Sequence, residues 1–72
     1  MQLSNVKEGS TVRIISIHGG RGIRGRLTKM GVHPGDLGTV ERNSFGPVLL
    51  KVRGNSVALG RGVAAKVEVS MV

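Results

Sequence analysis

The spacing of glycine limits what this chain can fold into more than any other feature. Twelve glycines are spread along 72 residues and divide the sequence into short segments. A glycine inside a helix costs about 1 kcal/mol relative to alanine, whereas glycine suits tight turns. The apolar residues between the glycines are mainly valine, isoleucine and leucine, and β-branched side chains favour strands. The sequence therefore predicts short strands joined by tight turns, in a single domain over residues 1–72.

Five segments have the composition of short strands: 11–18, 37–42, 47–53, 56–59 and 66–70. The clearest alternation is in 47–53, where Val48, Leu50 and Val52 share one face. In the last segment, Val67 and Val69 are expected to point inward. A hairpin loop is expected over 43–46 and a turn at Gly54-Asn55.

The first strand segment changes phase in its middle. Val12 and Ile14 fall on one face, whereas Ile15 and Ile17 fall on the other. Such a change of phase predicts either a β-bulge or burial on both faces of the strand.

A helix is predicted over residues 21–30. Ile23, Leu27 and Met30 stand at i, i+4 and i+7, which places them on one stripe. Gly31 falls where a left-handed C-terminal cap is expected. A further turn or single helical turn is expected around residues 60–62. Five short strands and one inserted helix favour a small, mostly β, closed or nearly closed barrel, because closure removes exposed sheet edges.

The residue types needed for catalysis are missing or scattered. There is no cysteine, and the four acidic residues show no pairing pattern for acid–base chemistry. The two histidines, His18 and His33, stand in no metal-ligand motif, and both are expected to be solvated. The sequence therefore predicts a protein that is not an enzyme, with no cofactor and no metal site that the residues specify.

The segment Gly20–Gly25 matches the glycine pattern of dinucleotide-binding turns. It follows a predicted strand and opens a predicted helix, and Glu41 lies at a suitable distance for a ribose contact. The chain then continues in hairpins and is about half as long as a doubly wound domain. We therefore do not assign a dinucleotide site.

Eleven lysines and arginines against four acidic residues give a formal charge of +7. Such a charge indicates an acidic protein surface, a nucleic acid or an anionic membrane as partner. Phe45 is the only aromatic residue, so base stacking is excluded and only phosphate-backbone binding remains as the nucleic-acid alternative. No signal peptide and no apolar run of about 20 residues is present, which predicts a cytoplasmic location.

Several motifs occur in order along the chain. Arg26, Leu27, Met30 and Gly31 are followed at once by Pro34-Gly35, then by Gly46-Pro47 and by Ala58-Leu59-Gly60. This combination resembles the ferrous iron transport protein A family, FeoA, and the related SH3-like domain of some iron-dependent repressors.

The resemblance implies an SH3-like β-barrel that assists ferrous iron uptake as a cytosolic accessory or regulatory protein. Its implied partner is FeoB, the membrane permease for ferrous iron. The matching residues are expected to be structural: Arg26, Leu27, Met30, Gly31, Pro34, Gly35, Gly46, Pro47, Ala58 and Leu59.

Docking charge is expected from Arg21, Arg24 and Lys29 on the helix and from Arg61 in the turn at 60–62. The sequence leaves open whether the protein forms a weak homo-oligomer and whether it binds a transition metal ion.

Overall fold

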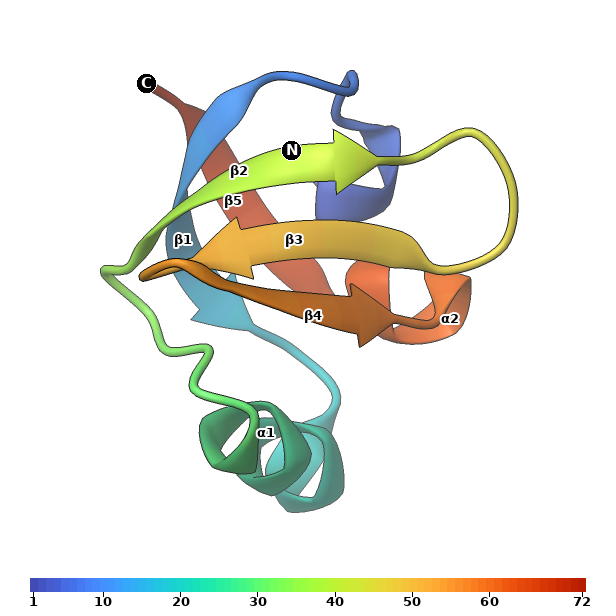
Figure 1. Ribbon diagram of the computed structural model, residues 1–72. Helices are drawn as coiled ribbons and strands as arrows, with labels where there is room; N and C mark the ends of the chain where they lie inside the picture. Colours follow the sequence, from blue (N-terminus) through green and yellow to red (C-terminus); the bar gives the residue numbers. More distant parts are fainter.

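The computed structural model describes residues 1–72 and contains one antiparallel sheet of five strands with three short helical segments (Figure 1). The elements in chain order are η1 (Leu3–Asn5), β1 (Thr11–Ile17), α1 (Gly20–Lys29), β2 (Leu37–Arg42), β3 (Val48–Val52), β4 (Asn55–Leu59), α2 (Arg61–Ala64) and β5 (Val67–Met71). The mostly β class, the five strands and the single inserted helix are confirmed. No helix is long and apolar enough to cross a membrane.

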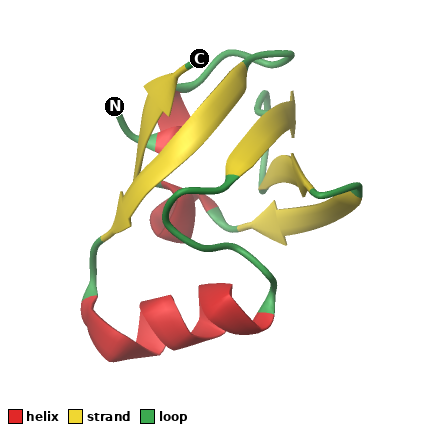
Figure 2. Cartoon of the chain, turned by 90° about the vertical axis from the view of Figure 1, so that its left-hand side faces the viewer, coloured by secondary structure: helices red, strands yellow, loops and turns green.

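The strands are ordered β4-β3-β2-β1-β5. Strands β1 to β4 therefore neighbour one another in sequence order, and β5 returns to pair with β1. The sheet curls around its core, and α2 joins the two edge strands, while α1 runs outside the sheet (Figures 1 and 2). Because β4 and β5 do not pair, the barrel is nearly rather than fully closed.

Strand β1 contains the bulge that the sequence predicted. Its register against β5 shifts between Ile14 and Ser16, so the alternation of faces changes there. As a result, Ile17 is buried on the same side as Val12 and Ile14, whereas Ile15 remains 48% exposed. Placing Ile15 and Ile17 together on one face was therefore wrong.

The turn between β3 and β4 lies one residue earlier than predicted. Arg53 and Gly54 are its two central residues, and both have positive φ, at 51° and 80°. A two-residue hairpin turn of this kind needs positive φ at both positions, and its twist matches that of the strands. Asn55 is therefore the first residue of β4, opposite Val52, and not a turn residue.

Helix α1 begins one residue before the predicted start and ends at its predicted glycine cap. Gly31 has φ +83° and donates to the Thr28 carbonyl at 3.0 Å, while Val32 donates to the Leu27 carbonyl at 2.9 Å. These two bonds form a Schellman motif. Leu27 and Val32 are both fully buried, so the cap also fixes the helix to the core.

The core consists of fifteen buried residues and all of them are aliphatic. Val48, Leu50, Val52, Val67 and Val69 point inward as the alternation predicted. Ile23 and Met30 are partly buried and pack against this core, which confirms the predicted helical stripe. No charged or polar side chain is buried.

Candidate functional site

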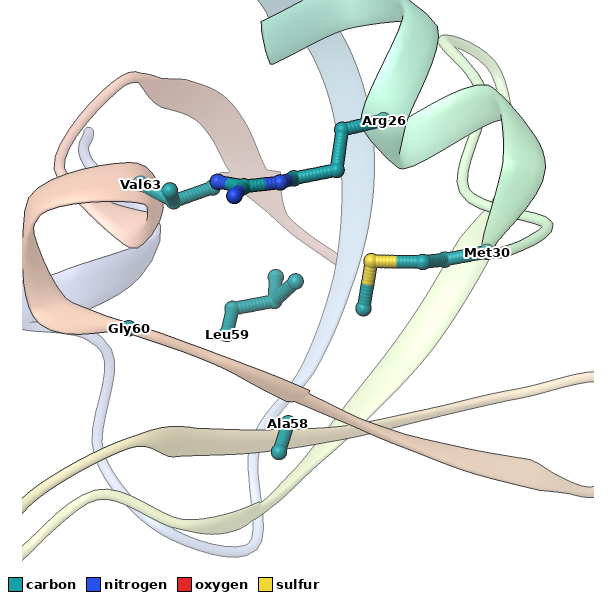
Figure 3. A pocket seen from close by; sticks show the side chains of 6 residues that line it. All are labelled: Arg26, Met30, Ala58, Leu59, Gly60 and Val63. Carbon is teal, nitrogen blue, oxygen red and sulfur yellow. The ribbon is translucent and has the colours of Figure 1, made fainter.

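One surface pocket lies where α1, the end of β4 and α2 meet. Its six lining residues are Arg26, Met30, Ala58, Leu59, Gly60 and Val63, and its volume is about 210 Å³. Arg26 and Met30 belong to one sequence motif, and Ala58 and Leu59 belong to another. More than twenty-five residues separate the two motifs in sequence, yet they form opposite walls of one pocket. Figure 3 shows the Arg26 and Met30 side chains extending from α1 towards α2 and β4.

The chemistry of this pocket is apolar with a single charge. Four of its six residues are hydrophobic. The Arg26 side chain extends across the pocket towards Val63 (Figure 3), and its guanidinium forms no hydrogen bond or ion pair within the protein. Cavities of about 150 Å³ can hold a benzene-sized group. The pocket can therefore accept one aliphatic side chain with a carboxylate close to it.

The three predicted docking charges on α1 are exposed. Arg21, Arg24 and Lys29 form no ion pair, and α1 contains no acidic residue. None of them lines the pocket, and Arg24 and Arg26 lie on opposite flanks of the apolar stripe. Their role in docking stays a prediction, and the structure adds Arg26 to the candidate cations.

Arg61, the fourth predicted docking charge, already has partners inside the protein. Its guanidinium donates to the Gly46 carbonyl at 3.1 Å and to the Ser4 carbonyl at 3.2 Å. Arg61 thus ties α2 to the β2–β3 loop and to η1. A docking role would compete with these bonds.

The β2–β3 loop carries Phe45, a candidate contact residue that the sequence analysis did not place in a site. Asn43 fixes the loop, because its side chain donates to the carbonyls of Ser4 at 2.9 Å and Val6 at 2.6 Å. Its backbone amide also donates to the Glu8 carboxylate at 2.7 Å. Phe45 stands at the tip of this fastened loop and is 92% exposed. The sequence did not reveal this arrangement, because the residues that hold the loop through Asn43, namely Ser4, Val6 and Glu8, are far from it in the chain.

Of the motif residues outside the pocket lining, Leu27 is buried in α1, and the others lie in turns and loops: Gly31, Pro34, Gly35, Gly46 and Pro47. Pro34 and Gly35 belong to the connection from α1 to β2, where the Gly35 amide donates to the Ile14 carbonyl at 2.6 Å. Gly46 and Pro47 end the β2–β3 loop before β3. Their structural role stays a prediction.

A polar cluster links the connection between α1 and β2 to the β3–β4 turn. The Asp36 carboxylate accepts a hydrogen bond from the His33 backbone amide at 2.9 Å and forms an ion pair with the Arg53 guanidinium at 2.6 Å. The His33 side chain is 44% exposed, and His18 is exposed as well. No group of three or more histidine, cysteine or acidic side chains is close enough to hold a metal ion.

The glycine pattern at Gly20–Gly25 lies within α1, between two strands that are antiparallel to each other. The structure therefore contains no βαβ unit at this position.

A curled five-stranded antiparallel sheet with one inserted helix defines a small SH3-like β-barrel. The chain belongs to the FeoA family, because the FeoA domain model matches residues 1–71. This family takes part in ferrous iron transport.

Individual relatives agree with this assignment. The chain is 40% identical over 67 residues to an Fe(2+) transport protein A from Methanocaldococcus jannaschii, covering 93% of this chain and 82% of the relative. It superposes on a crystal structure of an iron uptake regulatory protein, FeoA, with a TM-score of 0.90 and 34% identity, covering 99% and 95% of the two chains. Its fold is also that of part of IdeR from T. acidophilum, with a TM-score of 0.91 at 23% identity over 100% of this chain and 34% of IdeR.

Proposed function

We propose that this protein acts in the cytoplasm as an accessory and regulator of ferrous iron uptake by docking on the cytosolic part of a FeoB-type permease. The observation that carries the proposal is the FeoA domain match over residues 1–71. The core is entirely aliphatic, and no three histidine, cysteine or acidic side chains gather in one place, which fits a role in binding rather than chemistry.

The charge distribution supports an acidic partner. Only one arginine or lysine side chain, Arg53, forms an ion pair within the protein. The cations on α1 therefore stay available, and they surround the helix without any acidic residue between them. Opposite charge on a partner would speed encounter and set its orientation.

The test measures binding of the purified protein to the cytosolic domain of the permease by isothermal titration calorimetry at low salt. Arg21→Glu combined with Arg24→Glu should weaken binding by about tenfold or more, because each reversal turns attraction into repulsion. Lys7→Glu combined with Lys51→Glu is the matched control. It changes the net charge equally at exposed positions outside α1 and should weaken binding much less.

Two results would contradict the proposal. One is no detectable binding of the wild-type protein at low salt together with unchanged ferrous iron uptake after deletion of the gene. The other is nucleic acid that copurifies and persists through a high-salt wash, seen as absorbance at 260 nm. This protein itself absorbs little near 280 nm, because it has no tryptophan or tyrosine.

A further inference from the structure

The two edges of the sheet differ in what covers them. The outer side of β5 is covered by the N-terminal segment, since Gln2 bridges to Glu68 and the Val69 amide donates to the Met1 carbonyl at 2.7 Å. Strand β4 is paired only with β3. β4 is therefore the edge at which the sheet can still be extended.

The register of the hairpin shows which backbone groups of β4 are free. Asn55 closes the two-residue turn, so Asn55, Val57 and Leu59 exchange hydrogen bonds with β3. The residues between them, Ser56 and Ala58, direct their N–H and C=O groups away from β3. Both residues are exposed, and no backbone bond from a loop reaches them.

Strand β4 also lacks the features that protect most edge strands. Natural edges carry charged side chains, proline or a bulge that prevent another strand from pairing with them. Residues Asn55–Leu59 include no charge and no proline, and they pair with β3 without a register shift. An unprotected edge invites strand pairing, so this edge is suited to binding an extended chain.

The pocket described above opens beside this free edge. Ala58 and Leu59 of β4 form one wall, and Arg26 and Met30 of α1 form the opposite wall. Figure 1 shows α1 below the sheet, on the side on which β4 is the outermost strand. A strand added to β4 would lie between β4 and α1, with a side chain directed into the pocket.

We propose that β4 accepts an extended segment of a partner protein as a sixth strand. One aliphatic side chain of that segment fills the pocket, and an acidic side chain next to it pairs with Arg26. This mode of binding deepens the proposed function and rests on it for the identity of the partner, but strand addition can be tested separately.

The charge of the groove favours an acidic segment over a second copy of this chain. Arg26 is unpaired at the pocket, and Lys29 follows it on the same flank of α1. A second copy would bring another formal charge of +7 to the same groove. Like charges placed together oppose association.

The first test uses the probe peptide acetyl-Glu-Val-Leu-Val-Glu-amide, titrated into ¹⁵N-labelled protein while amide exchange with water is followed by NMR. Ser56 and Ala58 should exchange about tenfold more slowly at saturation, since their amides gain acceptors. The amide of Val57, already bonded to β3, should change little. This alternation distinguishes strand addition from any binding through side chains alone.

Two control peptides test the pocket and the charge. Alanine in place of the central leucine should weaken binding by about tenfold, because the pocket loses its apolar occupant. Lysine in place of both glutamates should weaken it by a similar factor. Equal binding of all three peptides would overturn the assignment of the pocket and of Arg26.

A pair of variants tests the edge with the permease's cytosolic domain. Ala58→Pro removes an N–H that has no partner within the protein, and edge strands tolerate proline. Ala58→Ser keeps that N–H and a side chain of similar size. The affinity of Ala58→Pro for the permease's cytosolic domain should be at least tenfold lower than that of Ala58→Ser. Circular dichroism should show that both variants are folded.

The outcomes separate the two proposals. If the permease domain binds but leaves the exchange of Ser56 and Ala58 unchanged, strand addition is wrong and the proposed function stands. If the peptide produces the alternation but the permease domain does not bind and deletion of the gene leaves ferrous iron uptake unchanged, the proposed function fails and strand addition stands. A probe peptide that leaves the exchange of both amides unchanged overturns strand addition by a partner segment. Protection of these amides that grows with protein concentration in the absence of peptide overturns it too, because a second copy of the chain would then be the occupant of β4.

Discussion

Arg26 shows how much the role of one residue depends on its surroundings. Its motif suggested a structural residue, yet its guanidinium has no partner in the protein and lies across an apolar pocket (Figure 3). Arg61 shows the reverse. It was expected to contribute to docking, but its guanidinium donates hydrogen bonds to two backbone carbonyls of the protein itself. Charge alone did not separate these two arginines, because the difference lies in the chain segments that surround each one.

Gly38 is a residue whose small size is required by packing. A Cβ atom at this position in β2 would lie 2.8 Å from Leu50 Cδ1 and 3.4 Å from the Lys51 carbonyl oxygen. Leu50 is fully buried and has little room to move. Gly38→Ala should therefore lower the free energy of unfolding by about 1–3 kcal/mol in urea titrations.

The matched control for Gly38 is Gly62→Ala in α2, where an added Cβ meets no atom within 4 Å. This variant should change the unfolding free energy by less than about 1 kcal/mol. Equal effects of the two substitutions would show that packing against Leu50 does not exclude a side chain at position 38.

Glu68 binds the amino terminus. The Met1 ammonium lies 2.7 Å from the Glu68 carboxylate. The hydrogen bond from this ammonium, followed by its charge, lowers the pKa of Glu68 below its usual value near 4.5. A carboxyl whose pKa is lower in the folded state stabilises the fold above the unfolded pKa and loses that contribution as the pH falls through the folded pKa.

The thermal midpoint of wild-type protein beginning at Met1 should consequently fall more steeply below about pH 4.5 than that of Glu68→Gln. The two proteins should approach each other in stability at the lowest pH, where Glu68 is protonated in both states. Parallel profiles over this range would contradict a stabilising role for the ion pair.

At the scale of elements, α1 combines weak helix propensity with a strong C-terminal cap. Gly22 and Gly25 stand within the helix, and an added Cβ at either meets nothing within 4 Å. The helix is held instead by its buried Leu27 and by the Schellman bonds around Gly31. Tertiary packing therefore supplies the stability that the helix sequence lacks.

Gly25→Ala should raise the unfolding free energy by up to about 1 kcal/mol, because alanine favours helix and its methyl group meets no neighbour. Gly31→Ala should lower it by about 1–2 kcal/mol, since φ is +83° there. Chemical denaturation of both variants checks the pair. A change of the same sign at both positions would contradict this account of α1.

At the scale of the whole molecule, the excess of cations decides which partners are attracted. The formal charge is +7, and ion pairs within the protein use only one of its lysine and arginine side chains. The interior contains no charge at all, so the excess is entirely on the surface. A field of this kind raises association rates with acidic partners.

Association with the permease's cytosolic domain should therefore be sensitive to salt. The rate constant, measured by stopped-flow or surface plasmon resonance, should fall by about tenfold or more between about 0.05 M and 0.5 M NaCl. The dissociation rate should change much less, because apolar contacts in the pocket are not screened. A rate constant that is independent of salt would rule out steering by these cations.

The sequence by itself determined the local elements of this protein. Alternating valines and leucines located the strands, the stripe of Ile23, Leu27 and Met30 located α1, and Gly31 located its end. These features depend on residues that lie close together in the chain, so periodicity and glycine placement reveal them.

The tertiary structure alone decided the rest. Whether Ile17 joins the core depended on the β1–β5 register, and the turn position depended on how β3 and β4 pair. The pocket brought Arg26 and Met30 against Ala58 and Leu59, and the covering of β5 by the N-terminal segment left β4 as the free edge. These features arise from contacts between segments far apart in sequence, which local periodicity does not encode.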